Sequence, residues 1–152
     1  MKKICSILIM LTVAACAVRG NVDKAFLRER LKVHTLIAVQ DGEIRYYDER
    51  GLAPLLVRVE NGAFKDAFVA DRVVGKASAL LHVYGGAREV YTPVLSKAAL
   101  PVYEKYNIPF SSDQVVEYIY NRDKTGIDPW EKAVENTDDP AEAFRILNAA
   151  AR

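Results

Sequence analysis

The stretch TLIAVQDGEIRYYD, residues 35–48, contains two short apolar segments joined by Asp41-Gly42. An Asp-Gly pair between such segments is typical of a type I′ turn, in which both central residues adopt a positive φ. The sequence therefore predicts a β-hairpin with strands over 35–40 and 43–48. This register sets two apolar pairs on one face of the hairpin, Val39 with Ile44 and Ile37 with Tyr46.

Helix and strand signals alternate along the rest of the chain. Asp23 can cap a first helix that ends near Val33, and Asp-Pro capping boxes at 128–131 and 139–142 open two short C-terminal helices. Apolar spacing predicts the intervening helices over 54–60, 71–84, 96–107 and 113–120. Short apolar runs predict strands over 67–70, 89–95 and 108–110. This alternation indicates a central mixed sheet with helices packed on it.

The N-terminal segment has the three-part layout of a secretory signal peptide. Two lysines precede an apolar run over 4–15, which is shorter than the roughly 20 residues that cross a bilayer, and Cys16 follows. The sequence VAAC at 13–16 resembles the lipobox of a bacterial lipoprotein. We therefore expect residues 1–15 to be a signal peptide and Cys16 to be lipidated, on the outer face of a bacterial membrane. Two alternatives are a secreted or periplasmic protein cut at the A-x-A site over 15–17, and a cytoplasmic protein translated from a downstream start.

Composition limits the classes of partner. The chain has 152 residues, with 21 Lys and Arg against 20 Asp and Glu. Loss of residues 1–15 removes two of the basic residues and no acidic one, so the charge stays near neutral. Nucleic-acid binding needs a clustered basic excess, and we expect no such partner. The length predicts one domain, over 21–152. Both cysteines, Cys5 and Cys16, precede it, so we expect no disulfide within the domain.

Two polar blocks carry a family resemblance. These are DRVVGKAS at 71–78 and NRDKTG at 121–126, the second running on to Pro129 and Glu131. Together with the upstream hairpin, they resemble a small bacterial family of unknown function whose members are similar to cytidine deaminases in fold. The resemblance implies an α/β fold, a three-layer α/β/α sandwich with a mixed sheet, and implies no activity. A cysteine often precedes the proline in that family. Asp128 stands there in this chain, so thiol chemistry is not expected.

A nucleoside deaminase binds zinc through one His or Cys and two further Cys, with a Glu as proton shuttle. In this chain the helix starts that would carry those ligands are Asp71 and Ser96, which are neither thiols nor imidazoles. The histidines, His34 and His82, have no partner at metal-ligand spacing, and we interpret them as ordinary partly buried or surface side chains. We therefore expect no zinc and no other cofactor.

The site position of the deaminase-like fold is where we expect a ligand. Asp71 and Lys76 would flank it, and Arg122 offers a guanidinium that can hold an anion in a bidentate way. Gly75 is interpreted as a small residue for close helix packing, because Ala70 replaces the first glycine of a phosphate-binding loop. The candidate ligand-binding residues are Asp71, Lys76, Ser96, Asn121, Arg122, Thr125 and Glu131.

Three hypotheses for function follow. The first is binding of a small polar or nucleotide-like ligand by this domain. The second is a non-zinc enzyme in which Asp71 and Lys76 serve as acid and base. The third is an envelope interaction protein with a vestigial pocket, attached to the membrane through its lipid anchor. A polar pocket that joins Asp71, Lys76 and Arg122 would favour the first two, and dispersal of these residues would favour the third.

Overall fold

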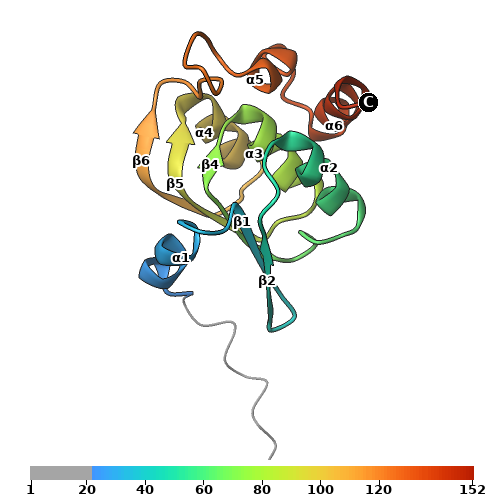
Figure 1. The fold of residues 1–152 in the computed structure, drawn as a ribbon. Coiled ribbons are helices and arrows are strands. Elements are labelled where there is room, and N and C mark those ends of the chain that lie inside the picture. The colour runs from blue at the N-terminus through green and yellow to red at the C-terminus, as the bar shows by residue number, and fades with distance from the viewer. Residues whose placement is uncertain (1–21) are drawn as a thin grey trace, which may run out of the picture.

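The computed structural model describes residues 22–152, and the predicted signal peptide and Cys16 lie outside this range. Within it, six strands form one mixed sheet (Figure 1). The strands are β1 (Leu36–Gln40), β2 (Glu43–Tyr47), β3 (Phe68–Asp71), β4 (Val73–Val74), β5 (Glu89–Ser96) and β6 (Phe110–Val116). The helices are α1 (Lys24–Arg30), α2 (Leu52–Glu60), α3 (Lys76–Tyr84), the 3₁₀ turn η1 (Lys97–Ala99), α4 (Leu100–Lys105), α5 (Pro129–Ala133) and α6 (Pro140–Ala150).

The sheet is antiparallel at one side and parallel at the other. Strand β1 pairs antiparallel with both β2 and β3. Strands β3 and β4 follow each other along one edge of β5, β6 runs along its other edge, and all three are parallel to β5. The parallel strands therefore end at the same side of the sheet, where loops of α/β proteins commonly form binding sites.

The hairpin prediction is confirmed. Asp41 and Gly42 have φ values of 52° and 82°, as a type I′ turn requires. Val39 is paired with Ile44 and Ile37 with Tyr46. The two β1 side chains are buried, whereas Ile44 and Tyr46 remain 46% and 39% exposed. The apolar face of the hairpin is therefore covered only along β1.

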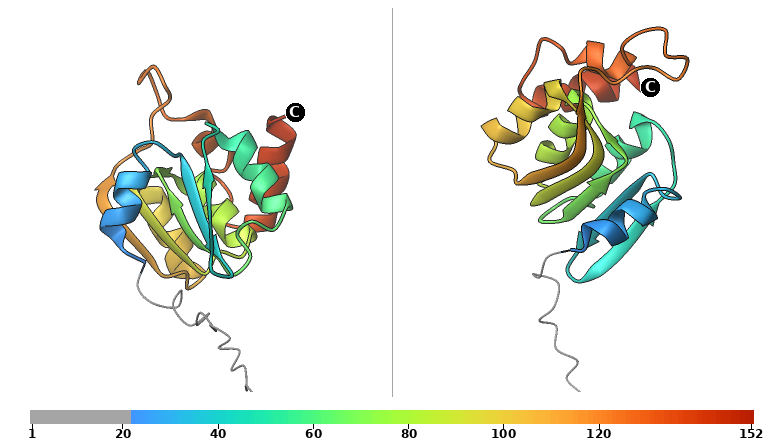
Figure 2. Two further views of the ribbon diagram at one scale, coloured as in Figure 1. Left: turned by 60° about the horizontal axis from the view of Figure 1, so that its bottom comes forward. Right: turned by 90° about the vertical axis from the view of Figure 1, so that its left-hand side faces the viewer.

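Alternating side chains of the sheet face two separate apolar clusters. Leu36, Val69 and Val90 belong to the larger cluster, which contains the buried residues of α2, α3, α4 and α6. Their neighbours Ile37, Ala70 and Tyr91 belong to a smaller cluster with Leu27 and Leu31 from α1 and the segment that follows it. Because successive side chains of a strand point to opposite faces, α1 lies across the sheet from the other helices (Figure 2).

One predicted helix is wrong in its extent, and another is replaced by a strand. The helix predicted from Asp71 begins only at Lys76, with Gly75 as its N-cap, and Val73 and Val74 form strand β4 instead. The helix predicted over 113–120 is wrong. Its first residues continue β6, which hydrogen-bonds along β5 from Phe110 to Val116. In both places β-branched valines at helical spacing are paired with a distant strand, and this pairing overrides local periodicity.

The predicted helix caps at the C-terminal end are confirmed in part. Asp128 accepts a hydrogen bond from the Trp130 amide, and Asp139 accepts from the amides of Ala141 and Glu142. Glu131 does not return to its own N-cap as a capping box would require, and contacts α3 instead.

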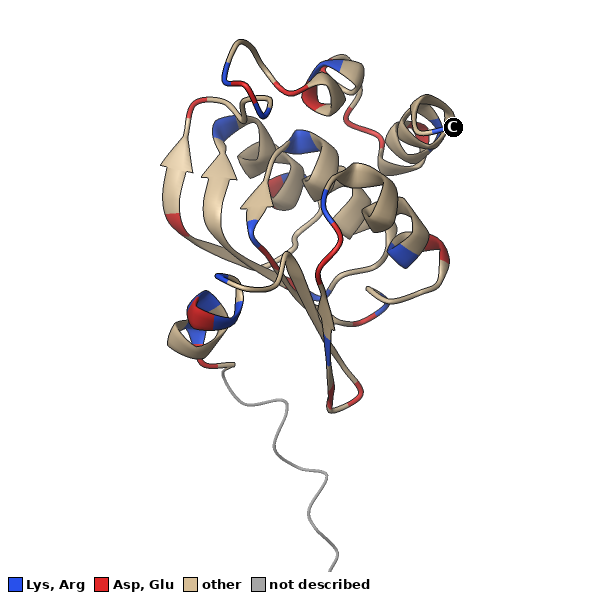
Figure 3. Cartoon of the chain, in the orientation of Figure 1, with Lys and Arg blue, Asp and Glu red and all other residues tan. Residues whose placement is uncertain are grey.

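The charged residues are distributed without a single-sign block. Lys and Arg alternate with Asp and Glu along the described chain (Figure 3). No helix within residues 22–152 is long and apolar enough to cross a membrane.

Candidate functional site

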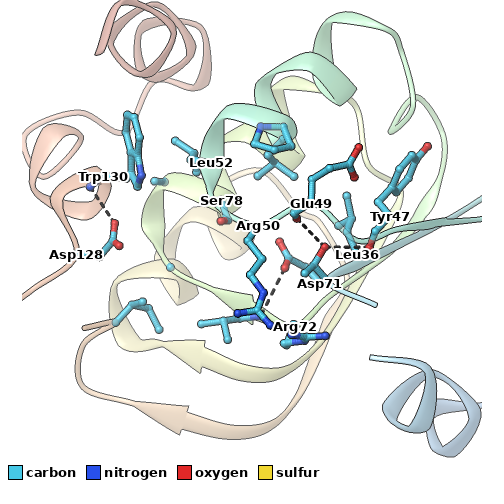
Figure 4. Close-up of a pocket in the computed structure, with 18 of the residues that line it drawn as sticks. Leu36, Tyr47, Glu49, Arg50, Leu52, Asp71, Arg72, Ser78, Asp128 and Trp130 are labelled. Carbon is cyan, nitrogen blue, oxygen red and sulfur yellow. Dashed lines mark hydrogen bonds between the residues drawn. The ribbon is translucent and has the colours of Figure 1, made fainter. Parts of the chain in front are cut away.

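A cavity of about 370 Å³ opens at the end of β3, between the start of α2, the first turn of α3 and helix α5. Its apolar wall includes Leu52, Pro54 and Trp130. In the close-up, Trp130 lies on the α5 side, Tyr47 on the β2 side, and Asp71 between them (Figure 4). The volume falls in the range of small-molecule sites.

Several charged side chains of the cavity wall are already paired within the protein. Arg58 forms an ion pair with Glu49, and its guanidinium lies 4.4 Å from the ring centroid of Tyr47. Arg72 donates hydrogen bonds to the carbonyl oxygens of Leu31 at 2.8 Å and His34 at 2.7 Å, and so ties the end of α1 to the wall. These guanidiniums have structural partners.

Glu131 uses both of its carboxylate oxygens to cap α3 from another part of the chain. Oε2 accepts from the Lys76 amide at 2.7 Å, and Oε1 accepts from the Ala77 amide at 3.0 Å. Burial raises the pKa of Glu131, and the two amide hydrogen bonds oppose that rise. A Cβ at Gly75 would lie 2.3–2.5 Å from the carboxylate atoms, so glycine is what allows this contact. The interpretation of Gly75 as a close-packing residue is confirmed.

Asp71 connects the cavity to a buried polar pair. Its side chain is 13% exposed and lines the cavity. Oδ2 lies 3.3 Å from Nε2 of His82, and His82 Nδ1 lies 2.7 Å from the Tyr103 hydroxyl. Both rings are fully buried. Burial, together with the negative charge of Asp71, raises the pKa of Tyr103 well above its ordinary value, so its hydroxyl keeps its proton.

Asp71 Oδ1 accepts a hydrogen bond from the Val73 amide at 3.4 Å, and the carboxylate keeps further lone pairs for a ligand. Two other polar groups of the wall also keep free hydrogen-bonding capacity. Within the described residues, Arg50 forms no salt bridge. Ser78, in the first turn of α3, also lines the cavity, and its hydroxyl has no hydrogen bond to a described residue. The cavity therefore presents a carboxylate, a guanidinium and a hydroxyl beside an apolar wall.

Of the seven residues selected from the sequence, the cavity brings together Asp71 and Glu131. Lys76 does not line it. Its ammonium lies 2.9 Å from Asp138 Oδ1 and donates to the carbonyl oxygen of Glu135 at 3.0 Å, so it joins α3 to the segment before α6. Asp71 and Lys76 are therefore not paired in one pocket.

The other four selected residues also lie outside the cavity wall. Asn121 and Thr125 bond to each other, with Asn121 Oδ1 accepting from the Thr125 amide at 3.0 Å, and so close a turn. Arg122 in that turn is exposed. Ser96 is buried at the end of β5.

Sequence reasoning missed Arg50, Ser78 and Trp130 as wall residues, and His82 as a buried partner of Asp71. Ser78 was inside the first resemblance block, and Trp130 was adjacent to Glu131. Arg50 follows the hairpin without any motif. His82 shares its helix face with apolar residues, which is why the sequence favoured an ordinary histidine. Within residues 22–152, no group of three or more His, Cys, Asp and Glu residues is placed to hold a metal ion.

Comparisons with known proteins identify the family. The family model "TM1506: Domain of unknown function (DUF1893)" matches residues 24–150. The crystal structure of a DUF1893 family protein (TM1506) from Thermotoga maritima is 30% identical and covers 86% of this chain and 93% of that chain, with a TM-score of 0.70. No curated protein matches the chain. The extent of the family match and the identity over most of both chains show that this protein belongs to the DUF1893 family.

Proposed function

We propose that the domain binds a small polar or nucleotide-like molecule in the cavity at the end of β3. The observation that carries this proposal is the free capacity of Asp71, Arg50 and Ser78 around one apolar-walled cavity. A ligand donor group would bond to Asp71, an anionic group would pair with Arg50, and the flat part of the molecule would lie against Trp130. The proposed occupant is therefore a compact molecule that combines hydroxyl or amino groups with a negative charge.

The proposed relation to cytidine deaminases concerns the fold. The six-stranded mixed sheet with α1 on one face and α3 on the other supports a three-layer α/β/α sandwich of that kind. The position of the cavity, between the end of β3 and the first turn of α3, supports a ligand site in the same place. The proposal does not include the zinc-dependent reaction.

A ligand panel tests the binding function. Cytidine, cytidine 5′-monophosphate and ribose 5-phosphate are added in a thermal-shift assay, and at least one is expected to raise the melting temperature. Because a hydrogen bond to a charged group contributes about 1.5–3 kcal/mol, Asp71→Asn and Arg50→Ala should each weaken that compound at least about tenfold. Trp130 is the single tryptophan of the chain, so its fluorescence gives the dissociation constant.

Arg122→Ala is the matched control for the panel, since Arg122 is an exposed arginine outside the cavity wall. Its affinity should equal that of the wild type. If Arg122→Ala weakened binding while Arg50→Ala did not, the site would lie at the 121–126 turn. If no compound raised the melting temperature, the binding proposal would be wrong.

We also propose that the mature protein is a lipoprotein anchored through Cys16, which the three-part layout of residues 1–16 supports. Mass spectrometry of the N-terminus of the protein made in a bacterial host is expected to show an acylated Cys16 as first residue. Several acyl chains would make the anchor stable. A chain that keeps Met1 would contradict this proposal.

A further inference from the structure

His82 and Tyr103 form a polar pair next to Asp71 that is buried among apolar side chains. His82 lies in α3 among buried apolar side chains, and Tyr103 lies in α4 within the same cluster. A buried polar group costs free energy unless its hydrogen bonds are satisfied, and apolar residues of similar size would fill the same space without that cost. The pair therefore calls for an account beyond packing.

The geometry defines which atom of His82 faces the cavity side. Because the Tyr103 hydroxyl keeps its proton, it can donate to His82 Nδ1 at 2.7 Å. A neutral imidazole that accepts at one nitrogen carries its proton on the other. That proton is then on Nε2, which lies 3.3 Å from Asp71 Oδ2 and is buried without a hydrogen-bond partner among the described residues. Catalytic hydrogen bonds are often long or poorly aligned without a ligand and tighten when one binds, so we expect the Nε2–Oδ2 hydrogen bond to form with substrate in the cavity.

We propose that Asp71 is a metal-free general base at the bottom of the cavity, with His82 and Tyr103 as positioning residues that hold its carboxylate toward the ligand. This inference rests on the proposed function, since it names what the bound molecule does there. The substrate class is a small molecule that presents a hydroxyl or amino group to Asp71. Asp71 is the group that touches the substrate.

The proton transfer is balanced within the site. The O–H or N–H bond of the ligand breaks, and its electron pair stays on the ligand oxygen or nitrogen. A new O–H bond forms on Asp71, which becomes neutral, and the same proton can return to the ligand. The Nε2–H of His82 stays in place throughout, because Tyr103 occupies the other ring nitrogen.

Other charged groups of the wall surround this carboxylate from every neighbouring element. They are Glu49, Arg50, Arg58, Arg72, Asp128 and Glu131. Glu49 is paired with Arg58, and both oxygens of Glu131 accept amide hydrogen bonds. Asp128 caps the Trp130 amide. Asp71 is the carboxylate of this wall that contacts a buried imidazole, and this distinguishes it from the other acids.

A base-catalysed elimination tests the proposal without knowledge of the natural substrate. The aromatic compound 5-nitrobenzisoxazole opens when a base removes its ring C–H proton and its N–O bond breaks. The apolar wall at Trp130 suits this flat compound. The wild type is expected to accelerate the reaction, and Asp71→Asn should lower the rate at least about tenfold, since a positioned base commonly contributes more than that. Glu43→Gln removes a carboxylate that is paired with Arg45 outside the cavity wall, and it should leave the rate unchanged.

The positioning role is tested by two changes at His82. The double variant His82→Leu and Tyr103→Phe removes both polar groups, so neither is left buried without the other. The double variant should stay folded and lose most of the rate. His82→Gln keeps an N–H donor for Asp71 and should retain a larger part of the rate than the double variant. A merely structural role would lower the melting temperature of these variants without this difference in rate.

A spectroscopic measurement completes the test. Since the chain has two histidines, nitrogen NMR resolves them, and His34→Asn assigns the signals. The free protein should show His82 protonated at Nε2, with a proton signal that shifts in Asp71→Asn and not in Glu43→Gln. An unprotonated Nε2, or equal elimination rates in wild type and Asp71→Asn, would overturn the proposal that Asp71 is a general base positioned by His82. A ligand panel without a binder would instead contradict the proposed binding function alone.

Discussion

Replacing Leu27 with alanine is expected to lower the free energy of unfolding by about 3 kcal/mol and to release α1 from the sheet. Leu27 is fully buried in the smaller apolar cluster, against side chains of β1, β3 and β5. The substitution removes apolar contacts and leaves a cavity, and the seven-residue helix is too short to persist without its docking surface. Chemical denaturation gives the free energy, and amide exchange shows which helix opens.

The exchange pattern distinguishes this prediction from general destabilisation. Amides of α1 should exchange fastest in the variant, while those of α3 and α6, which belong to the larger cluster, should keep their protection. Phe26→Ala is the control on the same helix, because Phe26 is 36% exposed and its ring lies 5.2 Å from the Arg30 guanidinium rather than in the smaller cluster, and its cost should stay well below that of Leu27→Ala. Equal losses for Leu27→Ala and Phe26→Ala would show that α1 is not held by the smaller cluster.

Release of α1 would also affect the cavity. Arg72 lines the cavity and donates to the carbonyl oxygens of Leu31 and His34, directly after α1. If α1 leaves the sheet, Arg72 loses these acceptors and its guanidinium is free to reorient in the wall. The smaller cluster therefore supports the candidate site although it lies on the opposite face of the sheet.

The parts of the fold that could be predicted from the sequence are those that depend on neighbouring residues. The Asp41-Gly42 turn sets the register of the first hairpin, and the N-caps Asp23, Asp128 and Asp139 are decided within three residues. Strand β4 and the part of β6 after Phe110 could not be predicted, because their valines pair with β5 from a distance. The spacing of apolar residues along the chain carries no information about a partner strand. The two valine-rich segments therefore fit a helix as well as they fit a strand.

The same limit applies to the candidate site. Asp71 and Glu131 were selected from blocks of sequence that carry the family resemblance, and both line the cavity. Lys76 lies only five residues from Asp71, but its ammonium pairs with Asp138 near α6. The direction of a long side chain depends on which charges the fold brings to it. His82 was missed for the converse reason, since its polar partners come from β3 and α4.

A second large effect is expected at Gly75 and Glu131. Gly75→Ala and Glu131→Ala should each cost about 2 kcal/mol, because each removes the two hydrogen bonds that cap α3. Gly75 has extended backbone angles, φ −102° and ψ −172°, that any residue can adopt, so the alanine strains no backbone. Its methyl group would occupy the position of the Glu131 carboxylate. The loss from Gly75→Ala therefore arises from displacement of Glu131.

The double variant provides the decisive measurement for this pair. Independent sites would add to about 4 kcal/mol, whereas we expect the double variant to lose about 2 kcal/mol, since the cap can be lost only once. Denaturant unfolding of the four proteins gives the coupling energy. Additive losses would mean that Gly75 is required for a reason other than the approach of Glu131.

The contribution of Glu131 to the free energy of unfolding changes with pH in a definite direction. Burial raises the native pKa of Glu131 above its unfolded value, so folding favours its protonated form. The stabilising contribution of Glu131 is then fully present below its ordinary pKa and decreases as the pH rises through the raised native pKa. The stability gap between wild type and Glu131→Ala should therefore narrow with increasing pH.

Asp138 and Asp139, whose pKa values are lowered, are present in both proteins, so their contributions cancel from this gap. The gap between Glu131→Gln and Glu131→Ala should not change with pH, because neither side chain ionises at position 131. A gap for the wild type that widened with pH would show that the two amide hydrogen bonds stabilise the Glu131 carboxylate more than burial destabilises it.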